Sequence, residues 1–154
     1  MAKINTPTKA EAFFTGECVF TAGAPTPESM PREHFPEIAF IGRSNVGKSS
    51  LVNAVTGRET LARVSNTPGR TQQLNFFRLG DRMLLVDMPG YGYAKASKDA
   101  IYDWNILIDS YLKDRNTLKR LCLLIDARHG VKENDREFMH NLAVYAVPFV
   151  AIIT

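Results

Sequence analysis

The sequence has 154 residues, 45% hydrophobic and 23% charged, which fits one soluble globular domain rather than a disordered or fibrous chain. Its 19 Lys and Arg against 16 Asp and Glu give a net charge of +3, compatible with a polyanionic partner such as RNA but more simply a solubilising surface. The two cysteines, Cys18 and Cys122, form no Cys-x-x-Cys pair, and no apolar segment approaches about 18 residues, so we expect a cytoplasmic chain without a zinc site, redox motif or membrane span.

Residues 1–36 are interpreted as an irregular N-terminal arm, because prolines at positions 7, 25, 27, 31 and 36 interrupt them. One possible extra strand lies at residues 18–20. From Glu37 onward apolar runs alternate with helical segments, which predicts a largely parallel sheet covered by helices. We therefore place the main domain at residues 37–154.

The first strand and helix of this domain flank a glycine-rich turn. Residues 38–41 form a short apolar run, and a helix is predicted to begin near Lys48. Residues 57–71 have weak periodicity and contain the turn signal Asn66-Thr67-Pro68-Gly69, so we predict a mobile loop there.

Two further strands are predicted at residues 74–79 and 83–87, with a tight turn at Gly80-Asp81 between them. A loop rich in Gly and Tyr follows at residues 89–98. Apolar and aromatic residues then recur at helical spacing and predict an amphipathic helix: Ile101, Trp104, Ile108, Tyr111 and Leu112.

The last predicted elements are a strand, a helix and a strand. Residues 121–125 predict a buried strand, and residues 147–153 predict the final one. Between them Phe138, Leu142 and Tyr145 mark a helix, with Asn134 or Asp135 expected as its N-cap. The complete pattern predicts an α/β fold of three layers with a mostly parallel central sheet.

The strongest chemical signal is Gly42-Arg43-Ser44-Asn45-Val46-Gly47-Lys48-Ser49, which matches the pattern G-x-x-x-x-G-K-[ST]. It follows an apolar strand and opens a helix, as a phosphate-binding loop (P-loop) requires. Glycines let the main chain wrap around phosphate oxygens, and the helix N-terminus adds partial positive charge. We expect Lys48 to reach the β- and γ-phosphates of a nucleotide and the Ser49 hydroxyl to ligate Mg²⁺. A glycine turn without a ligand is the weaker explanation.

A second motif, Asp87-Met88-Pro89-Gly90, has the form D-x-x-G and follows the strand predicted at residues 83–87. An Asp at a strand end beside a P-loop can hold Mg²⁺ through water, and the Gly90 N–H can face a γ-phosphate. The motif alone is weak, and a plain turn would explain it. Its place after a strand and downstream of Lys48 favours the functional interpretation.

Thr71 lies in the loop between the two motifs. A hydroxyl there could complete the Mg²⁺ shell only when a γ-phosphate is bound, which would make the loop sensitive to the nucleotide. Spacing alone barely separates Thr71 from Thr67 in this role.

Three segments together resemble the bacterial EngB (YihA/YsxC) GTPases, within the group that contains the Era and TrmE GTPases. They are Gly42 to Ser50, then Asn66-Thr67-Pro68-Gly69-Arg70-Thr71-Gln72, then Asp87-Met88-Pro89-Gly90-Tyr91-Gly92-Tyr93-Ala94. The resemblance implies a three-layer P-loop GTPase fold, nucleotide contacts from Gly69 to Gln73, and Thr71 as the switch-I ligand of Mg²⁺. It also implies a role in assembling the large ribosomal subunit, and a link to cell division and septation.

The residues expected at the site combine the motifs with this resemblance. Lys48 and Asn45 are expected to be catalytic, and Ser49 and Thr71 to ligate Mg²⁺. The nucleotide is expected to contact Gly42, Arg43, Ser44, Asn45, Val46, Gly47, Lys48, Ser49, Ser50, Gly69, Arg70, Thr71, Gln72, Gln73, Asp87, Met88, Pro89, Gly90 and Thr154.

The base-reading motif of the family is only begun here. The family reads guanine with a Thr-Lys-x-Asp loop after its fifth core strand, and this sequence closes on Val150-Ala151-Ile152-Ile153-Thr154. The resemblance alone therefore supplies guanine specificity. We expect the sequence to be a C-terminally truncated version of a longer domain.

Tyr91 and Asn45 bear on hydrolysis. Tyr91 occupies the place where many GTPases carry a Gln that orients the attacking water, and an aromatic side chain cannot do this. Packing or a surface contact is therefore the favoured role, and hydrolysis should be slow. In related GTPases an Asn at the place of Asn45 helps to bind K⁺ near the phosphates. Asn also suits a tight loop without any ion, and the sequence leaves both explanations open.

The expected function is a Mg²⁺-dependent GTP switch acting on a precursor of the large ribosomal subunit, its rRNA and proteins, with neither a membrane nor DNA as partner. The alternatives are a small-molecule P-loop kinase and an RNA-binding assembly factor with negligible hydrolysis. Arg128-His129 is given no catalytic role. A basic cluster could contact RNA, although a solvated helix end is the favoured explanation; it comprises Lys113, Arg115, Lys119 and Arg120.

Overall fold

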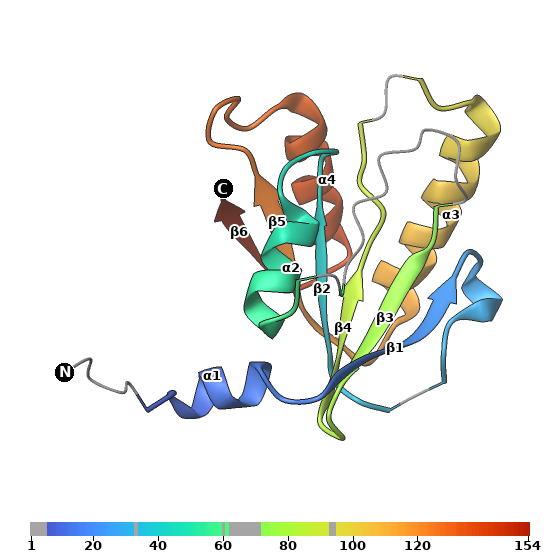
Figure 1. The fold of residues 1–154 in the computed structure, drawn as a ribbon. Helices are drawn as coiled ribbons and strands as arrows, with labels where there is room; N and C mark the ends of the chain where they lie inside the picture. Colours follow the sequence, from blue (N-terminus) through green and yellow to red (C-terminus); the bar gives the residue numbers. More distant parts are fainter. Residues whose placement is uncertain (1–5, 33, 60, 62–71, 93–94) are drawn as a thin grey trace.

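The computed structural model describes residues 6–32, 34–59, 61, 72–92 and 95–154 (Figure 1). In this part of the chain the strands are β1 Cys18–Ala24, β2 Glu37–Gly42, β3 Leu74–Leu79, β4 Met83–Asp87, β5 Leu118–Ile125 and β6 Phe149–Ile153. The helices are α1 Lys9–Phe14, α2 Lys48–Thr56, α3 Lys98–Asp114 and α4 Glu133–Val144, with a short 3₁₀ turn, η1, at Pro27–Ser29.

The described strands form one six-stranded sheet in the order β1-β3-β4-β2-β5-β6. Strand β2 pairs in parallel with β4 and β5, and β5 pairs in parallel with β6, whereas β3 runs antiparallel to both β1 and β4. The predicted mostly parallel sheet is therefore confirmed. Because β2, β4, β5 and β6 share one direction, their carboxyl ends meet at the same edge.

Two apolar clusters, one on each face of the sheet, make the molecule three-layered. Successive side chains of a strand point to opposite faces, and β4 shows this clearly. Leu84 and Val86 join the cluster beneath α3 and α4, while Met83 and Leu85 join the cluster on the other face.

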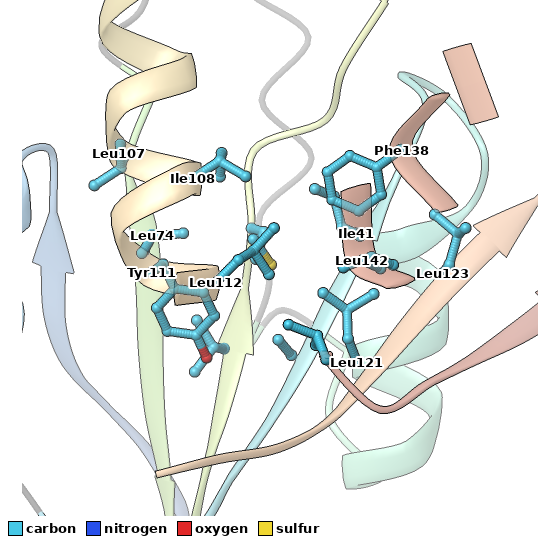
Figure 2. Packing of buried hydrophobic residues seen from close by; sticks show 14 of the residues in the cluster. Ile41, Leu74, Leu107, Ile108, Tyr111, Leu112, Leu121, Leu123, Phe138 and Leu142 are labelled. Carbon is cyan, nitrogen blue, oxygen red and sulfur yellow. The ribbon is translucent and has the colours of Figure 1, made fainter. Parts of the chain in front are cut away.

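The larger cluster packs α3 and α4 onto the sheet. Figure 2 shows Leu107, Ile108, Tyr111 and Leu112 of α3 beside Leu74, and Phe138 and Leu142 of α4 beside Leu121 and Leu123. Ile101, which was expected on the apolar stripe of α3, is 47% exposed, so the buried stripe begins further along the helix.

Helix α2 lies on the opposite face, and α1 lies near the lower end of the sheet in Figure 1. Val52 of α2 is buried there, and Phe13 and Phe14 of α1 pack partly buried against the same cluster. Helix α1 was not predicted from the sequence, although Thr8 and Glu11 form a recognisable N-terminal cap. The Glu11 N–H donates to Thr8 Oγ1 at 3.1 Å and the Thr8 N–H donates to Glu11 Oε2 at 2.6 Å, which is a capping box.

Strand β1 is longer than the run expected at residues 18–20. It pairs antiparallel with β3 along its length, with a register shift between Phe20 and Ala22. The N-terminal arm thus contributes the edge strand next to β3, and the Gly80 N–H bonds to Glu17 O at 2.8 Å.

Three local predictions are wrong in detail. The N-cap of α4 is Lys132 rather than Asn134 or Asp135; the Lys132 N–H donates to Asp135 Oδ2 at 2.8 Å, so Asp135 caps the helix from inside its first turn. The final strand begins at Phe149. The turn between β3 and β4 has three residues instead of two, because Leu79 pairs with Met83.

Glu37, at the start of β2, is the centre of a buried polar network. Its Oε1 accepts bonds from Arg115 Nε at 2.8 Å and Thr117 Oγ1 at 2.9 Å, and its Oε2 accepts one from Tyr111 Oη at 2.8 Å. Burial is the main cause that raises the pKa of Tyr111 well above its usual range. Arg115 is therefore a core ion-pair partner, and its assignment to a basic surface cluster was wrong.

None of the helices in the described ranges combines the length and apolar character that crossing a membrane would require.

Candidate functional site

The carboxyl edge of the parallel strands brings together segments that lie far apart in the sequence. The P-loop follows β2, the D-x-x-G motif begins at Asp87 at the end of β4, and Asp126 and Thr154 follow β5 and β6. A cavity of about 210 Å³ opens at this edge, lined by Arg43, Ser44, Asn45, Val46, Leu124, Asp126, Arg128 and His129. Ligand sites of α/β sheets lie outside this edge of the strands.

The main chain of the P-loop takes the tight turn expected of a phosphate cradle. Asn45 and Gly47 have φ of 63° and 95°, in the left-handed region. Glycine enters this region without steric cost, and Asn enters it more easily than most residues. The left-handed backbone conformation therefore explains why Asn occupies position 45 without any bound ion.

The N-terminus of α2 has no side-chain cap. Its N-cap is Gly47, whereas α3 is capped by Ser97, whose Oγ accepts a bond from the Ala100 N–H at 3.2 Å. The first N–H groups of a helix need an external acceptor and favour an anion. Within the P-loop, Ser44 Oγ is buried without a hydrogen-bond partner among the described residues. These orphaned polar groups fit a phosphate ligand.

Lys48 and Asp87, the charged residues of the two motifs, contact each other. Lys48 Nζ donates to Asp87 Oδ1, and the two side chains are only 14% and 9% exposed. Ser49 follows Lys48 in the first turn of α2. A hydroxyl and a carboxylate are the hard oxygen ligands that Mg²⁺ prefers. Among the described residues no cluster of three or more His, Cys, Asp and Glu is arranged to hold a metal by itself.

The D-x-x-G segment runs along the end of β2 and the start of the P-loop. The Met88 N–H donates to Phe40 O at 3.0 Å, and the Tyr91 N–H donates to Gly42 O at 3.3 Å. A Cβ on Gly90 would lie 3.0 Å from Gly42 O and 3.4 Å from the Ser44 nitrogen. A side chain at this position would crowd the two main chains, so glycine suits their close approach.

Tyr91 points into the molecule. It is 7% exposed, and its ring stacks on Phe138 with the centroids 5.2 Å apart. Of the two roles expected for Tyr91, packing or a surface contact, the structure shows packing.

Residues of the loop before β3 divide into two groups. Gly69, Arg70 and Thr71 lie outside the described residues. The Gln73 side chain donates to Asn75 Oδ1 at 2.8 Å and lies over Gly23 of β1. Gln72 lines a second cavity, of about 510 Å³, together with Gly90, Tyr91, Trp104 and Phe138. Gln72 therefore lines the same cavity as Gly90, whereas the Gln73 side chain contacts β1 and β3.

Thr154 contacts the P-loop main chain. Its hydroxyl donates to Val46 O at 2.9 Å, and its N–H bonds to Ile125 O at 2.9 Å. Thr154 thereby joins the end of β6 to the loop and to β5.

Two carboxylates at this edge were not predicted as site residues, although Asp135 was expected as a helix cap. Asp126 accepts bonds from Arg128 Nη2 at 2.7 Å and from the Arg128 N–H at 2.9 Å, which lower the pKa of Asp126 to about 2. Its place after a buried strand was a usable signal. Asp135 is 1% exposed and accepts a bond from Tyr91, a pairing that no local pattern announces.

The sequence is similar to a family of known proteins. The family described as 50S ribosome-binding GTPase matches residues 37–154. The chain is 55% identical over 146 residues to a probable GTP-binding protein EngB of Rhodospirillum rubrum, with 92% of this chain and 63% of that relative aligned. The chain thus spans less than two thirds of the length of that relative.

Solved structures share the fold. A crystal structure of a probable GTP-binding protein engB superposes with a TM-score of 0.60 at 24% identity, covering 76% of this chain and 69% of that one. A single-residue variant of Era from Aquifex aeolicus, bound to GDP·AlF₄⁻, superposes with a TM-score of 0.53 at 22% identity, covering 79% of this chain and 40% of that one.

Proposed function

The chain belongs to the EngB family of GTP-binding proteins, and on this premise we propose that it binds GTP with Mg²⁺ and hydrolyses it slowly to GDP and phosphate. The observation that carries the proposal is the meeting of the P-loop and the D-x-x-G motif at one sheet edge, with Lys48 in contact with Asp87. The uncapped N-terminus of α2 supplies the anion-binding end of the same site.

Phosphate binding would change the partners of Lys48 and Asp87. Lys48 would leave the Asp87 carboxylate and bind the β- and γ-phosphates, and Asp87 would then be available to hold Mg²⁺. Ser49, Asp87 and Thr71 are the residues we assign to hold Mg²⁺, directly or through water. The bound metal supplies neutralisation of the charge on phosphate oxygens.

The nucleotide would act as a switch. The Gly90 N–H and the Thr71 hydroxyl are both assigned to the γ-phosphate side, so GTP and GDP should favour different arrangements of their loops. The partner we propose is a precursor of the large ribosomal subunit in the cytoplasm, with consequences for cell division and septation. The 50S ribosome-binding description of the matching family supports this partner.

One observation favours a second candidate, an assembly factor that binds nucleotide but barely hydrolyses it. Tyr91 is buried on Phe138 and bonded to Asp135, so it is not placed to orient an attacking water. Hydrolysis would then need a group from elsewhere, such as K⁺ bound with the help of Asn45 or a residue of the ribosomal partner.

The test is binding and turnover by the same protein sample. Fluorescent GDP and a non-hydrolysable GTP analogue should bind in a Mg²⁺-dependent manner, with ATP as a competitor to report base selectivity. Multiple-turnover phosphate release is then measured with and without large ribosomal subunits. Stimulated release supports a GTPase switch, tight binding without release supports the second candidate, and absence of binding rejects both.

A further inference from the structure

Tyr91 is anchored to α4 by a short hydrogen bond. Its hydroxyl donates to Asp135 Oδ1 at 2.6 Å, and its ring stacks on Phe138 at an interplanar angle of 18°. Hydrogen bonds to an ionised carboxylate are shorter and stronger than neutral ones. The side chain that follows the D-x-x-G motif is thus fixed to a helix that begins 42 residues later in the chain.

Asp135 is itself held rigidly. Its second oxygen, Oδ2, accepts the Lys132 N–H at 2.8 Å at the N-terminus of α4, and the residue is only 1% exposed. Both carboxylate oxygens therefore have a fixed donor. Burial, followed by the bond to Asp135, raises the pKa of Tyr91 well above its usual range, so the hydroxyl keeps its proton.

The main chain of the same residue contacts the P-loop through weaker bonds. The Tyr91 N–H donates to Gly42 O at 3.3 Å, and Tyr91 O accepts from the Ser44 N–H at 3.4 Å. Both distances exceed those typical of strong N–H···O bonds. Among the contacts that the described residues make with Tyr91, the side-chain anchor is therefore the shortest hydrogen bond, directly beside Gly90.

We propose that Asp135 is a positioning residue for the binding of the γ-phosphate. Through its hydrogen bond to Tyr91, it holds the Gly90 N–H beside the P-loop, where the γ-phosphate would bind. This inference rests on the proposed function, because it concerns the group assigned to read GTP. Tyr91 occupies the position where many GTPases carry the side chain that orients the attacking water. In this structure its contacts with Asp135 and Phe138 instead fix the D-x-x-G loop. Gly90 lies between the fixed Tyr91 and Asp87, which contacts Lys48.

The test compares GDP with a non-hydrolysable GTP analogue in Tyr91→Phe and Asp135→Asn. The affinity for the analogue should fall about three- to tenfold, because a γ-phosphate contact is loosened, while GDP affinity changes less than about twofold. The matched control is Tyr111→Phe, which removes another buried Tyr–carboxylate bond, of 2.8 Å, at the other end of the sheet. The control should destabilise the fold and leave the ratio of the two affinities unchanged.

A second variant separates positioning from stability. Tyr91→Phe alone leaves the Asp135 carboxylate buried without its Tyr91 donor, whereas the double variant Tyr91→Phe with Asp135→Asn leaves no charge there, so its melting temperature should recover toward wild type. Its defect toward the GTP analogue should persist. An unchanged affinity ratio in the double variant, or equal losses for GDP and the analogue, would overturn the positioning role. Failure of the wild type to bind either nucleotide would instead overturn the proposed function, and this inference with it.

Discussion

Gly90 faces the P-loop so closely that an added methyl group would make an unusually tight contact with the main chain. A Cβ there would lie 3.0 Å from Gly42 O, a backbone atom that cannot move aside cheaply. Gly90→Ala should therefore push the D-x-x-G loop away from the P-loop. We expect the affinity for a GTP analogue to fall about tenfold, the value of one charge-assisted hydrogen bond, with a smaller loss for GDP.

Paired titrations with the two nucleotides measure this effect. Gly80→Ala is the matched control, since Gly80 has a φ of 55° and open space around its missing Cβ. That change strains a turn far from the site and should leave the affinity ratio alone. Equal behaviour of the two alanine variants would show that Gly90 does not face the γ-phosphate.

Variants at position 45 can distinguish a conformational role of Asn45 from a role in binding K⁺. Its φ of 63° explains the residue by conformation alone, so the K⁺ hypothesis needs a variant that keeps the turn. Asn45→Gly does so, whereas Asn45→Ala also strains the loop. We expect K⁺ to stimulate GTP hydrolysis about tenfold or more over Na⁺ in the wild type, as part of the roughly 10³–10⁵ that an arginine finger supplies.

Single-turnover hydrolysis in matched KCl and NaCl gives the answer. Stimulation should vanish in Asn45→Gly while nucleotide binding is kept. Equal rates in the two salts, or a K⁺ effect that survives in Asn45→Gly, would remove the ion from the mechanism.

At the scale of elements, continuous apolar runs made the strands that are buried on both faces predictable. In β5 the residues Leu121, Leu123 and Ile125 face one cluster while Cys122 and Leu124 face the other, so the run is apolar throughout and the strand is evident from sequence. The P-loop was predictable for a different reason, because its chemistry is local: one segment of eight residues contains the strand end, the turn and the helix start.

Contacts between distant residues were not predictable from these patterns. The bond from Tyr91 to Asp135 joins residues 44 apart, and either side chain alone fits a solvated loop or a helix cap. Arg115 was assigned to a basic surface for the same reason. Its partner Glu37 lies 78 residues away, and no local pattern predicts that the two residues meet. Helix α1 was a different kind of miss, because its capping box was present at Thr8 and Glu11.

The Glu37 network joins the arm, β2, α3 and β5. Arg115 bonds to Glu37 and also donates to Pro31 O at 2.8 Å, so it fastens the arm to the end of α3. Glu37→Gln should leave the guanidinium buried without its counter-charge and lower the free energy of unfolding by about 3 kcal/mol. Denaturant unfolding measures the loss.

The control for that experiment is an exposed pair. Lys113 and Asp109 are 47% and 46% exposed, and Lys113→Met should change stability far less than Glu37→Gln. If both variants unfold at the same denaturant concentration, the network is not a structural centre. Nucleotide affinity measured well below the midpoint should be unchanged in Glu37→Gln, since the network lies at the opposite end of the strands from the site.

At the scale of the molecule, one edge of one sheet carries the whole proposed chemistry. The P-loop, the D-x-x-G motif and Thr154 follow different strands, and Asp135 reaches the same edge from α4. A ligand at this edge would therefore contact segments from most of the fold. Its binding energy should appear as stability of the entire domain rather than of one loop.

Thermal unfolding tests this coupling directly. At a free nucleotide concentration of about 100 times Kd, binding adds about 2.7 kcal/mol, which for a domain of this size raises Tm by about 5–10 °C. Mg²⁺·GDP and a Mg²⁺·GTP analogue should each produce a shift, and chelation of the metal should reduce it. Lys48→Ala, compared with its own unliganded Tm, should lose most of the shift at the same concentrations, because the contacts to the β- and γ-phosphates are gone. A shift of wild-type size in Lys48→Ala would place the nucleotide elsewhere on the molecule and detach the P-loop from the function proposed for it.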